Sequence, residues 1–253
     1  MATFDDLVAE GESTPVDGWD FSWFAGRATE QRPGWGYARL LSARLATARH
    51  ALDLQTGGGE VLAAAVDGHR PATLTATEGW PPNVALARQR LAPLGGTVVE
   101  VAEDAPLPFP AGSFDLVSSR HPVSTDWAQI ARVLVPGGTY LSQQVGAGSV
   151  HELIDFMMGP QVIGAGRAPD RHRAAAVAAG LRVTELRDAW LRMEFADVAA
   201  VIVFLRKVIW TVPGFTVDGY RERLRALHEQ IRTAGPFVAH SRRFLITATK
   251  PSV

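Results

Sequence analysis

The feature that most limits the fold of this chain is an alternation of short β-like runs with helix-like runs between residues 50 and 146. Strands and helices that alternate at this length pack as a parallel sheet covered by helices on both faces, with right-handed connections between the strands. The predicted strands are 50–55, 72–77, 97–103, 114–120 and 138–146, and the predicted helices between them are 60–66, 83–95 and 125–134.

The pattern changes after residue 146. A glycine-rich loop at 159–170 leads into a short helix and a strand at 181–195. Two further helices are predicted at 196–205 and 220–232, and the last strand is predicted at 242–250. The whole set therefore predicts seven strands.

Neither an internal repeat nor a low-complexity linker divides the sequence, so we expect one domain over residues 1–253. Residues 41–146 carry the regular alternation and form the expected ligand-binding core. Residues 1–40 form an N-terminal addition. The C-terminal part, 147–253, contains a cap-like insertion at about 196–240.

Composition narrows the class of protein. The chain has 253 residues, of which 47% are hydrophobic, and this is enough for one large α/β core. Its formal net charge is −1, so no overall positive field attracts nucleic acid or an acidic membrane. This charge balance does not exclude a local basic patch. The absence of cysteine excludes disulfides, thiolate metal sites and a cysteine nucleophile. The histidines are scattered, and we expect no metal.

Two segments bear on location. Residues 1–14 are acidic and lack the apolar region of a signal peptide. The longest apolar stretch, 196–205, is too short to span a bilayer and is followed at once by Arg206 and Lys207. We therefore expect a cytoplasmic protein with no membrane partner, either a monomer or a homodimer.

A glycine-rich turn joins the first predicted strand to the first helix. The sequence DLQTGGGE occupies residues 53–60, at the position where α/β sheets bind nucleotides. Gly57 and Gly59 let the backbone pass close to a ligand because no Cβ stands in the way. An ordinary strand-to-helix loop is the alternative.

Acidic residues follow the next two strands. Glu78 ends the second strand, where a carboxylate can accept hydrogen bonds from both ribose hydroxyls. Asp104 and Ala105 follow the third strand, where a carboxylate can bind the exocyclic amine of an adenine. Taken in this order, the turn and the two acids favour a ligand site over an ordinary loop.

With these residues, the stretch from about Ala51 to Gly146 resembles the class I S-adenosylmethionine-dependent methyltransferases of the type 11-like kind. The first motif of that family is D-x-G-x-G-x-G. Residues 53–59 follow it, except that Gln55 stands where the first glycine is usual. The resemblance implies an α/β, Rossmann-like fold with a seven-stranded, mostly parallel sheet, helices on both faces and an antiparallel last strand, which RFLITATK at 243–250 fits.

The resemblance also implies the cofactor S-adenosylmethionine, with S-adenosylhomocysteine as its product. Asp53 and the turn would hold its aminopropyl-carboxylate end, Glu78 its ribose and Asp104 its adenine amine. Trp80 would pack flat along the adenine. The expected cofactor-binding residues are Asp53, Gln55, Thr56, Gly57, Gly59, Glu78, Gly79, Trp80, Glu103, Asp104, Ala105 and Arg120.

NAD is the competing cofactor. A dinucleotide turn needs a third glycine three positions after the second, and here that position holds Leu62. Glu60, directly after the turn, would repel a pyrophosphate at the start of the helix. Both observations favour S-adenosylmethionine, which carries no phosphate.

Absences narrow the methyl acceptor. The fourth strand ends in SSRHP at 118–122, which differs from the [N/D/S]-P-P-[Y/F] sequence of enzymes that methylate adenine or glutamine amides. Without cysteine, the covalent route to C5-methylated pyrimidines is closed, and no cluster of carboxylates follows the fourth strand to hold magnesium. We expect O- or N-methylation of a small molecule.

Two other functions stay open. The first is a ribosomal or transfer RNA methyltransferase, because arginines recur between 221 and 243 and form a local basic face. Glu222 and Glu229 among them indicate instead a solvated helix with internal ion pairs. The second is a protein that binds the cofactor without catalysis.

His121, just beyond the fourth strand, is the candidate catalytic base, because a neutral imidazole can take a proton near neutral pH. A structural histidine is the alternative. Arg120 either orients an acidic acceptor or pairs with a surface carboxylate. Gln143 and Gln144 point to opposite faces of the fifth strand, so at most one of them lines the pocket.

The N-terminal stretch at 18–37 is rich in tryptophan and arginine and short of regular patterning. It forms either a lid over the cofactor, where a tryptophan face can lie beside the sulfonium, or a segment that its aromatic side chains pack against the sheet. The apolar helix at 196–210 is a candidate wall of the acceptor pocket or a plain core helix. The candidate wall residues are Trp19, Trp23, Trp35, Phe204, Trp210 and Phe215.

Overall fold

The computed structural model describes residues 2–16, 21–66 and 70–252. The chain folds into two compact units. One contains residues 33–146, 165–189 and 243–253 and is called the sheet unit; the other contains residues 1–32, 147–164 and 190–242 and is called the helical unit. The single-domain description remains a prediction.

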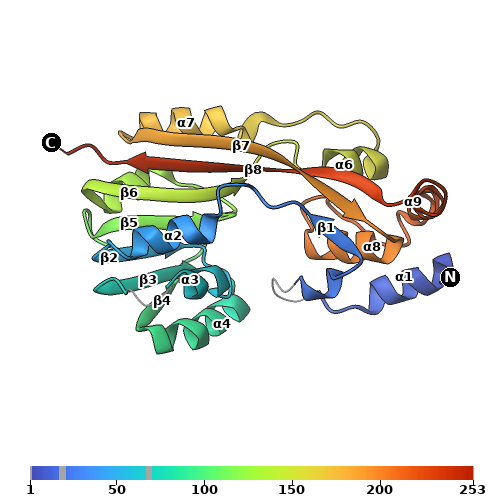
Figure 1. Cartoon of the computed structure of the whole chain (residues 1–253), viewed down its shortest axis with the longest axis horizontal. Helices are drawn as coiled ribbons and strands as arrows, with labels where there is room; N and C mark the ends of the chain where they lie inside the picture. The colour runs from blue at the N-terminus through green and yellow to red at the C-terminus, as the bar shows by residue number, and fades with distance from the viewer. Residues whose placement is uncertain (1, 17–20, 67–69, 253) are drawn as a thin grey trace. The chain divides into compact units, whose positions relative to one another are not determined.

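The described strands follow the hydrogen-bonded order β1-β7-β8-β6-β5-β2-β3-β4. Their bounds are β1 Ala28–Glu30, β2 His50–Leu54, β3 Thr73–Glu78, β4 Gly96–Glu100, β5 Phe114–Arg120, β6 Leu134–Val145, β7 Arg182–Phe195 and β8 Phe237–Thr249. Strands β2 to β6 pair in parallel, whereas β8 runs antiparallel to β6. The Rossmann-like fold and its antiparallel last strand are confirmed (Figure 1).

The prediction of seven strands was one too low. The additional strand is β1, which pairs antiparallel with the end of β7 and has only three residues. Three residues are too few to show an alternating pattern, so no periodicity marks this strand in the sequence. The third predicted strand was also too long, because β4 ends at Glu100 and residues 101–107 form a loop.

Helices cover both faces of the sheet unit. On one face lie α2 Tyr37–Leu45, α3 Glu60–Ala65 and α4 Pro81–Leu91, which is followed by the short η2 Ala92–Leu94 (Figure 1). On the other face lie α5 Trp127–Val133 and α7 Pro169–Ala178, preceded by η3 Ala165–Arg167. Each face has its own apolar cluster, because successive residues of a strand point to opposite sides.

Strand residues show this division directly. Ala51, Leu116 and Leu141 are buried beneath α2, α3 and α4. Leu52 and Val117, one position further along their strands, are buried on the face of α5 and α7. Both faces of the central strands are therefore dry, as a parallel sheet requires.

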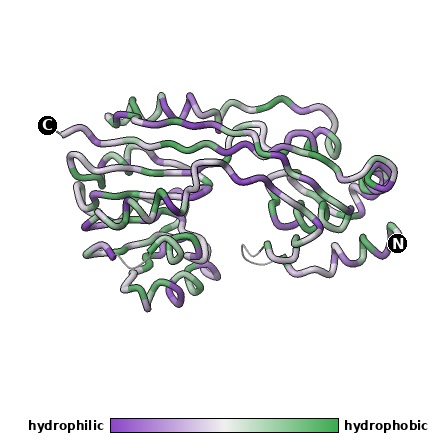
Figure 2. Tube along the Cα trace, viewed as in Figure 1, coloured by the Kyte–Doolittle hydropathy of each residue, from purple (hydrophilic) through white to green (hydrophobic). Residues whose placement is uncertain are grey.

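The helical unit is built around α8 Val198–Lys207. Nine of its ten residues are buried, and its trace is mostly hydrophobic in Figure 2. It packs with α1 Phe4–Ser13, α6 His151–Met158 and α9 Arg221–Ala234, and η1 Ser22–Phe24 adds Phe24 to the same cluster. A helix that is apolar on all sides is typically buried in a core, and α8 forms the core of the helical unit.

Three α-helices, α1, α2 and α6, were not assigned from the sequence. Helix α1 begins with a capping box in which Thr3 and Asp6 satisfy each other's backbone N–H groups. Helix α2 begins after Gly36, whose φ of +62° lies in the left-handed region. Among the helices of the described ranges, none has the length and apolar content that a bilayer crossing requires.

Candidate functional site

The carboxyl ends of the parallel strands meet at one edge of the sheet unit. Asp53 near the end of β2 pairs in register with Ser118 of β5, and Glu78 pairs with Glu100 at the end of β4. The chain runs from β2 outward to β3 and β4 and then crosses back to β5 on the other side of β2. Such a reversal of strand order leaves a crevice at the strand ends, where α/β sheets bind ligands.

The glycine turn has a left-handed backbone at three positions. Gln55, Gly57 and Gly59 have φ values of +53°, +63° and +79°. Glycine adopts this conformation freely, whereas glutamine does so only when other contacts hold it there. Gln55 therefore has a left-handed backbone at the position where the family motif has its first glycine.

The side chain of Gln55 provides those contacts. Its Oε1 accepts from the backbone N–H of Val123 at 2.7 Å, and its Nε2 donates to the backbone oxygen of Ser124 at 2.9 Å. Both partners lie in the loop after β5. Gln55 thus ties the turn after β2 to the loop that carries His121, which a glycine cannot do.

Glu78 holds the other side of the turn. Its buried carboxylate accepts from the backbone N–H of Gly57 at 2.7 Å, of Gly79 at 3.1 Å and of Trp80 at 3.0 Å. A carboxylate has about four acceptor positions, so these bonds leave room for few others. A ribose that binds here must share the carboxylate with the backbone of the turn.

Asp53 is buried beneath the turn. Its Oδ1 accepts from the Ser118 hydroxyl at 2.6 Å. Burial raises the pKa of Asp53 to about 6, and the hydrogen bond from Ser118 opposes this rise. The carboxyl therefore changes charge close to neutral pH.

Most of the remaining predicted cofactor residues lie in exposed positions. Glu103, Asp104 and Ala105 occupy the loop after β4, and Arg120 is an exposed residue at the end of β5. Trp80 precedes α4 and is 45% exposed. Thr56, between Gln55 and Gly57, is half-buried, and its backbone N–H donates to Thr77.

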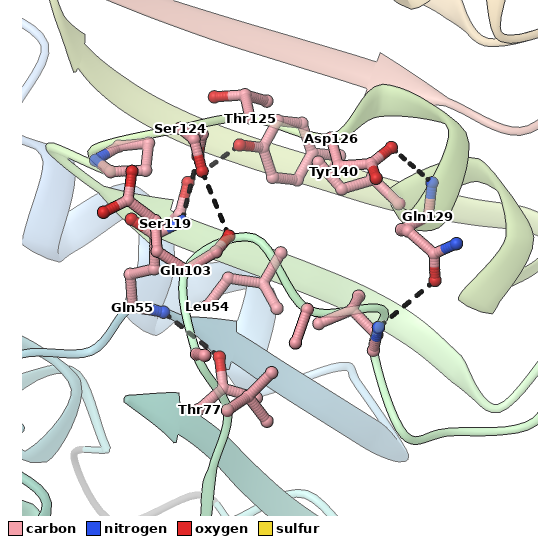
Figure 3. Close-up of a pocket in the computed structure, with 16 residues that line it drawn as sticks. Leu54, Gln55, Thr77, Glu103, Ser119, Ser124, Thr125, Asp126, Gln129 and Tyr140 are labelled. Atoms are coloured by element: carbon pink, nitrogen blue, oxygen red, sulfur yellow. Dashed lines mark hydrogen bonds between the residues drawn. The ribbon is translucent and has the colours of Figure 1, made fainter. Parts of the chain in front are cut away.

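A small pocket opens at this edge within the sheet unit (Figure 3). Gln55, Glu103 and Ala105 line it, together with Ser119 and Tyr140 from the floor of the sheet. Asp104, Glu78 and Trp80 are not among its lining residues. The pocket therefore joins the Gln55 side of the turn to part of the loop after β4, and the predicted roles of all these residues remain predictions.

The floor of the pocket is a cluster of neutral hydroxyl groups. Ser119 Oγ lies 2.8 Å from Tyr140 OH and 2.9 Å from Ser142 Oγ. Burial raises the pKa of Tyr140, so its phenol keeps its proton. The sequence analysis did not predict a role for Ser119, Tyr140 or Ser142. No local sequence pattern marks polar residues as functional when they lie in a strand that is buried on both faces.

His121 lies directly after β5 with a left-handed backbone, φ +54°, and its N–H donates to the backbone oxygen of Gln143 at 2.7 Å. Its Nε2 lies 2.9 Å from Nε2 of Gln143. Burial, followed by the nearby charges of Arg120 and Arg243, lowers the pKa of His121 well below its usual range. The imidazole is therefore neutral at physiological pH.

Gln143 and Gln144 have different partners on the two faces of β6. Gln143 contacts His121 and also accepts from Trp35 Nε1 at 2.7 Å. Gln144 Nε2 donates to Thr125 Oγ1 at 3.2 Å. Both amides are buried, and each is occupied within the protein.

The candidate wall residues fall into different surroundings. Trp35 is buried in the sheet unit beside α2, whereas Phe204 is buried in the core of the helical unit. Trp23 and Phe215 pack on that same core, and Trp210 is about half-exposed. Trp19 lies outside the described residues.

The ion pair of Glu60 modifies the argument against NAD. Arg90 of α4 lies 2.7 Å from the Glu60 carboxylate and also donates to the backbone oxygen of Gly58. This pairing weakens the repulsion expected between Glu60 and a pyrophosphate. The missing third glycine is unaffected, because Leu62 is buried at that position.

Comparison with known proteins agrees with this arrangement. Residues 52–142 match the family model of the methyltransferase domain. None of the curated proteins matches the sequence significantly. Several solved structures share the fold at low sequence identity.

A Bacillus halodurans protein assigned as a methyltransferase is 16% identical, with a TM-score of 0.60, 85% of this chain covered and 99% of the other. A Haloferax volcanii protein, solved with the Trm112 methyltransferase activator, is 22% identical, with a TM-score of 0.54 and coverage of 99% and 96%. Geranyl diphosphate methyltransferase in complex with S-adenosylmethionine is 13% identical, with a TM-score of 0.51 and coverage of 84% and 84%.

Residues 52–142 match a methyltransferase domain, and the fold around them is shared with solved structures assigned as methyltransferases. The cofactor predicted from the sequence, S-adenosylmethionine, is the one bound in the geranyl diphosphate methyltransferase structure.

Proposed function

We propose that the protein transfers a methyl group to an oxygen or nitrogen atom of a small molecule. The transfer is a direct displacement at the sulfonium, so the protein has to align the acceptor with the methyl group and keep water away. In this proposal the turn and Asp53 hold the aminopropyl-carboxylate end, Glu78 holds the ribose, and Asp104 and Trp80 bind the adenine. His121 lies near the acceptor.

The observation that carries the small-molecule proposal concerns the arginines after residue 220. Arg221 pairs with Asp5 of α1 at 2.5 Å, and Arg225 lies over the ring of Phe4 at 4.4 Å. Arg232 pairs with Glu229 at 2.9 Å. These side chains hold α9 to α1 or to itself within the helical unit.

Arg242 is also engaged within the helical unit. Its guanidinium lies 5.0 Å from the ring centre of Trp190, and it donates to the backbone oxygen of Ala147. An RNA-binding face needs several arginines directed at phosphates, and binding there falls steeply with salt. Because these arginines already serve packing, they support an RNA acceptor less well than the sequence alone suggests.

A ribosomal or transfer RNA methyltransferase is the second candidate. The Haloferax volcanii neighbour was solved with a methyltransferase activator, whereas the geranyl diphosphate enzyme is named for a small acceptor. At 22% and 13% identity, neither name decides the acceptor of this chain. An assay of the methylated product distinguishes an RNA acceptor from a small-molecule acceptor.

The test is to incubate the protein with methyl-labelled S-adenosylmethionine and either total RNA or the small-molecule fraction of a cell extract. We expect label in the small-molecule fraction and none in RNA at moderate salt. Label in one RNA species, in an amount comparable to that of the enzyme and at moderate salt, would overturn the proposal. Protein heated before the assay is the control for chemical methylation by the cofactor.

We also propose that residues 21–37, the described part of the lid predicted at 18–37, close over the bound cofactor; residues 18–20 lie outside the described residues. Trp23 has Arg27 over its ring at 4.7 Å, and Arg27 pairs with Glu10 at 2.8 Å. A segment rich in such side chains, connected to a folded helix, suits a lid better than a free tail.

A further inference from the structure

Three side chains of the sheet unit form a row of hydrogen bonds that ends at His121. Trp35 Nε1 lies 2.7 Å from Gln143 Oε1, and Gln143 Nε2 lies 2.9 Å from His121 Nε2. Trp35 and Gln143 are only 5% and 4% exposed. The row is thus shielded from water over its first two members.

The chemistry of the groups fixes the direction of the row. An indole N–H can only donate, so the atom of Gln143 that faces Trp35 must be its oxygen. The atom of Gln143 that faces His121 is then its NH₂ group, which also can only donate. Consequently Nε2 of His121 must accept, and the proton of the neutral imidazole lies on Nδ1.

The same row opposes protonation of the imidazole. An imidazolium would place an N–H of His121 against the N–H of Gln143. Rotating the amide to relieve this contact would place its NH₂ against the N–H of Trp35. The row therefore disfavours the imidazolium form. Burial and the charges of Arg120 and Arg243 disfavour it as well, and they lower the pKa of His121.

The other ring nitrogen of His121 remains available. Among the described residues, Nδ1 has no hydrogen-bond partner in the protein, and it is not one of the buried unpaired polar atoms. The strained backbone at φ +54° is held by the bond from the N–H of His121 to the backbone of Gln143. Gln143 thus fixes both the main chain and the ring of His121.

We propose that Trp35 and Gln143 are positioning residues that hold His121 as the Nδ1–H tautomer, so that the imidazole donates a hydrogen bond to the methyl acceptor and removes no proton from it. The proposal rests on the proposed function in placing His121 beside the acceptor. It replaces the catalytic base with a donor, because the only lone pair of the ring is occupied by Gln143.

The donor role restricts the substrate class. An attacking atom that finds no base at His121 must be nucleophilic enough to attack the methyl group without first giving up a proton. Carboxylates, acidic phenols and unprotonated amines meet this requirement near neutral pH, whereas an aliphatic alcohol does not. We therefore infer an acceptor whose methylated atom needs no deprotonation by His121.

The tautomer can be measured without any substrate. In protein with isotope-labelled histidine, the two ring nitrogens of each histidine have distinct nitrogen chemical shifts, and His121→Asn assigns the signals. We expect His121 as the neutral Nδ1–H form at about pH 7. In Gln143→Glu the carboxylate accepts from both neighbours, so His121 should change to the Nε2–H form. In Trp35→Phe the amide is free to rotate, and a mixture of tautomers is expected.

His50 serves as the internal control, because its Nδ1 contacts Thr73 Oγ1 at 2.9 Å and neither substitution touches it. An Nε2–H form of His121 in the wild-type protein, or an unchanged tautomer in Gln143→Glu, would overturn the proposal. Gln143→Glu keeps the size of the side chain, so the test stands even where loss of the indole in Trp35→Phe prevents folding. Thermal unfolding checks that the variants are folded.

Activity then separates a donor from a base. The amide of an asparagine can place an N–H near the position of Nδ1, whereas alanine cannot. We expect the turnover of His121→Asn to exceed that of His121→Ala by roughly tenfold or more, with little change in S-adenosylhomocysteine affinity. Equal loss in both variants would contradict the donor role. The tautomer measurement fails or succeeds independently of whether the acceptor is a small molecule or RNA.

Discussion

At the scale of single residues, the site depends on two buried carboxyl groups with different hydrogen-bond partners. Glu78 accepts from three backbone N–H groups, whereas Asp53 accepts from the Ser118 hydroxyl and has its pKa raised by burial to about 6. Glu78 therefore shapes the turn, while Asp53 carries a charge that depends on pH.

We predict that cofactor affinity depends on the ionisation of Asp53. If the Asp53 carboxylate holds the ammonium of the cofactor, binding of S-adenosylhomocysteine should weaken by about tenfold between roughly pH 7 and pH 5, across the pKa of about 6. The sign for folding is opposite. A carboxyl whose pKa is raised binds its proton more tightly when folded, so its contribution to stability is present at low pH and is lost as the pH rises through about 6.

Calorimetric titrations over this pH range provide the measurement, with Asp53→Asn as the control. Asparagine keeps the shape of the side chain and does not ionise, so the variant should bind weakly at every pH. The same pH dependence in the variant would show that another group is responsible.

The residues of the turn were predictable because strand ends and glycine spacing are local patterns. Asp53, Glu78 and Gly57 follow directly from them. The bridge from Gln55 to the loop after β5 was not predictable, since Val123 and Ser124 lie almost 70 positions away, at sequence separations of 68 and 69. Trp35 and Gln143 are 108 residues apart in the sequence, so their hydrogen bond could be found only from the structure.

At the scale of elements, the contact between α1 and α8 organises the helical unit. Phe4, Leu7 and Val8 of α1 join the apolar cluster around α8. Gly11 is a point of close approach between the two helices, because a Cβ placed there would lie 2.9 Å from Cβ of Ile202. The capping box at Thr3 is a local pattern from which α1 could have been assigned, whereas no local pattern indicates that α8 is its partner helix.

We predict that Gly11→Ala destabilises the protein. Alanine improves helix propensity by about 0.5–1 kcal/mol, but overpacking against the buried Ile202 costs about 1–3 kcal/mol. Urea denaturation measures the balance, and Glu12→Ala on the exposed side of the same helix is the matched control. A Gly11→Ala variant as stable as the wild type would show that the two helices are not in tight contact.

The lid is tested at the same scale. Deleting residues 1–36 would also remove α1 from its core, so hydrogen exchange on the intact protein is the better measurement. We predict slower exchange of the backbone at 21–30 when S-adenosylhomocysteine binds, because a closed lid excludes water. Residues 4–13, buried against α8, are the internal reference. If 21–30 exchange at the same rate with and without the ligand, this segment is no lid.

At the scale of the whole molecule, strand order gathers residues that are distant in the sequence. The segments 53–59, 78–80 and 103–105 each lie at the end of a parallel strand of the sheet unit or shortly after it, and parallel strands end at one edge. The alternation between residues 50 and 146 was sufficient to predict this architecture. It was not sufficient for the division into two units, since that depends on contacts between segments such as 1–32 and 190–242.

The central claim is that this edge of the sheet is the S-adenosylmethionine site, and Glu78 is the residue on which the claim depends most. Its loss removes the acceptor for the N–H groups of Gly57, Gly79 and Trp80 and, in the proposed function, the acceptor for the ribose hydroxyls. Glu100, the register partner of Glu78 on β4, is an exposed glutamate that makes a matched control. Glu78→Gln keeps the size of the side chain where Glu78→Ala does not fold.

The most direct measurement is calorimetric titration of S-adenosylhomocysteine into the wild type, Glu78→Ala, Glu78→Gln and Glu100→Ala, with thermal unfolding as the check on folding. We expect both Glu78 variants to lose roughly 1.5–3 kcal/mol of binding free energy, on the order of tenfold to a hundredfold in affinity, while Glu100→Ala binds as the wild type does. Unchanged affinity in folded Glu78→Ala and Glu78→Gln would contradict the placement of the cofactor at this edge.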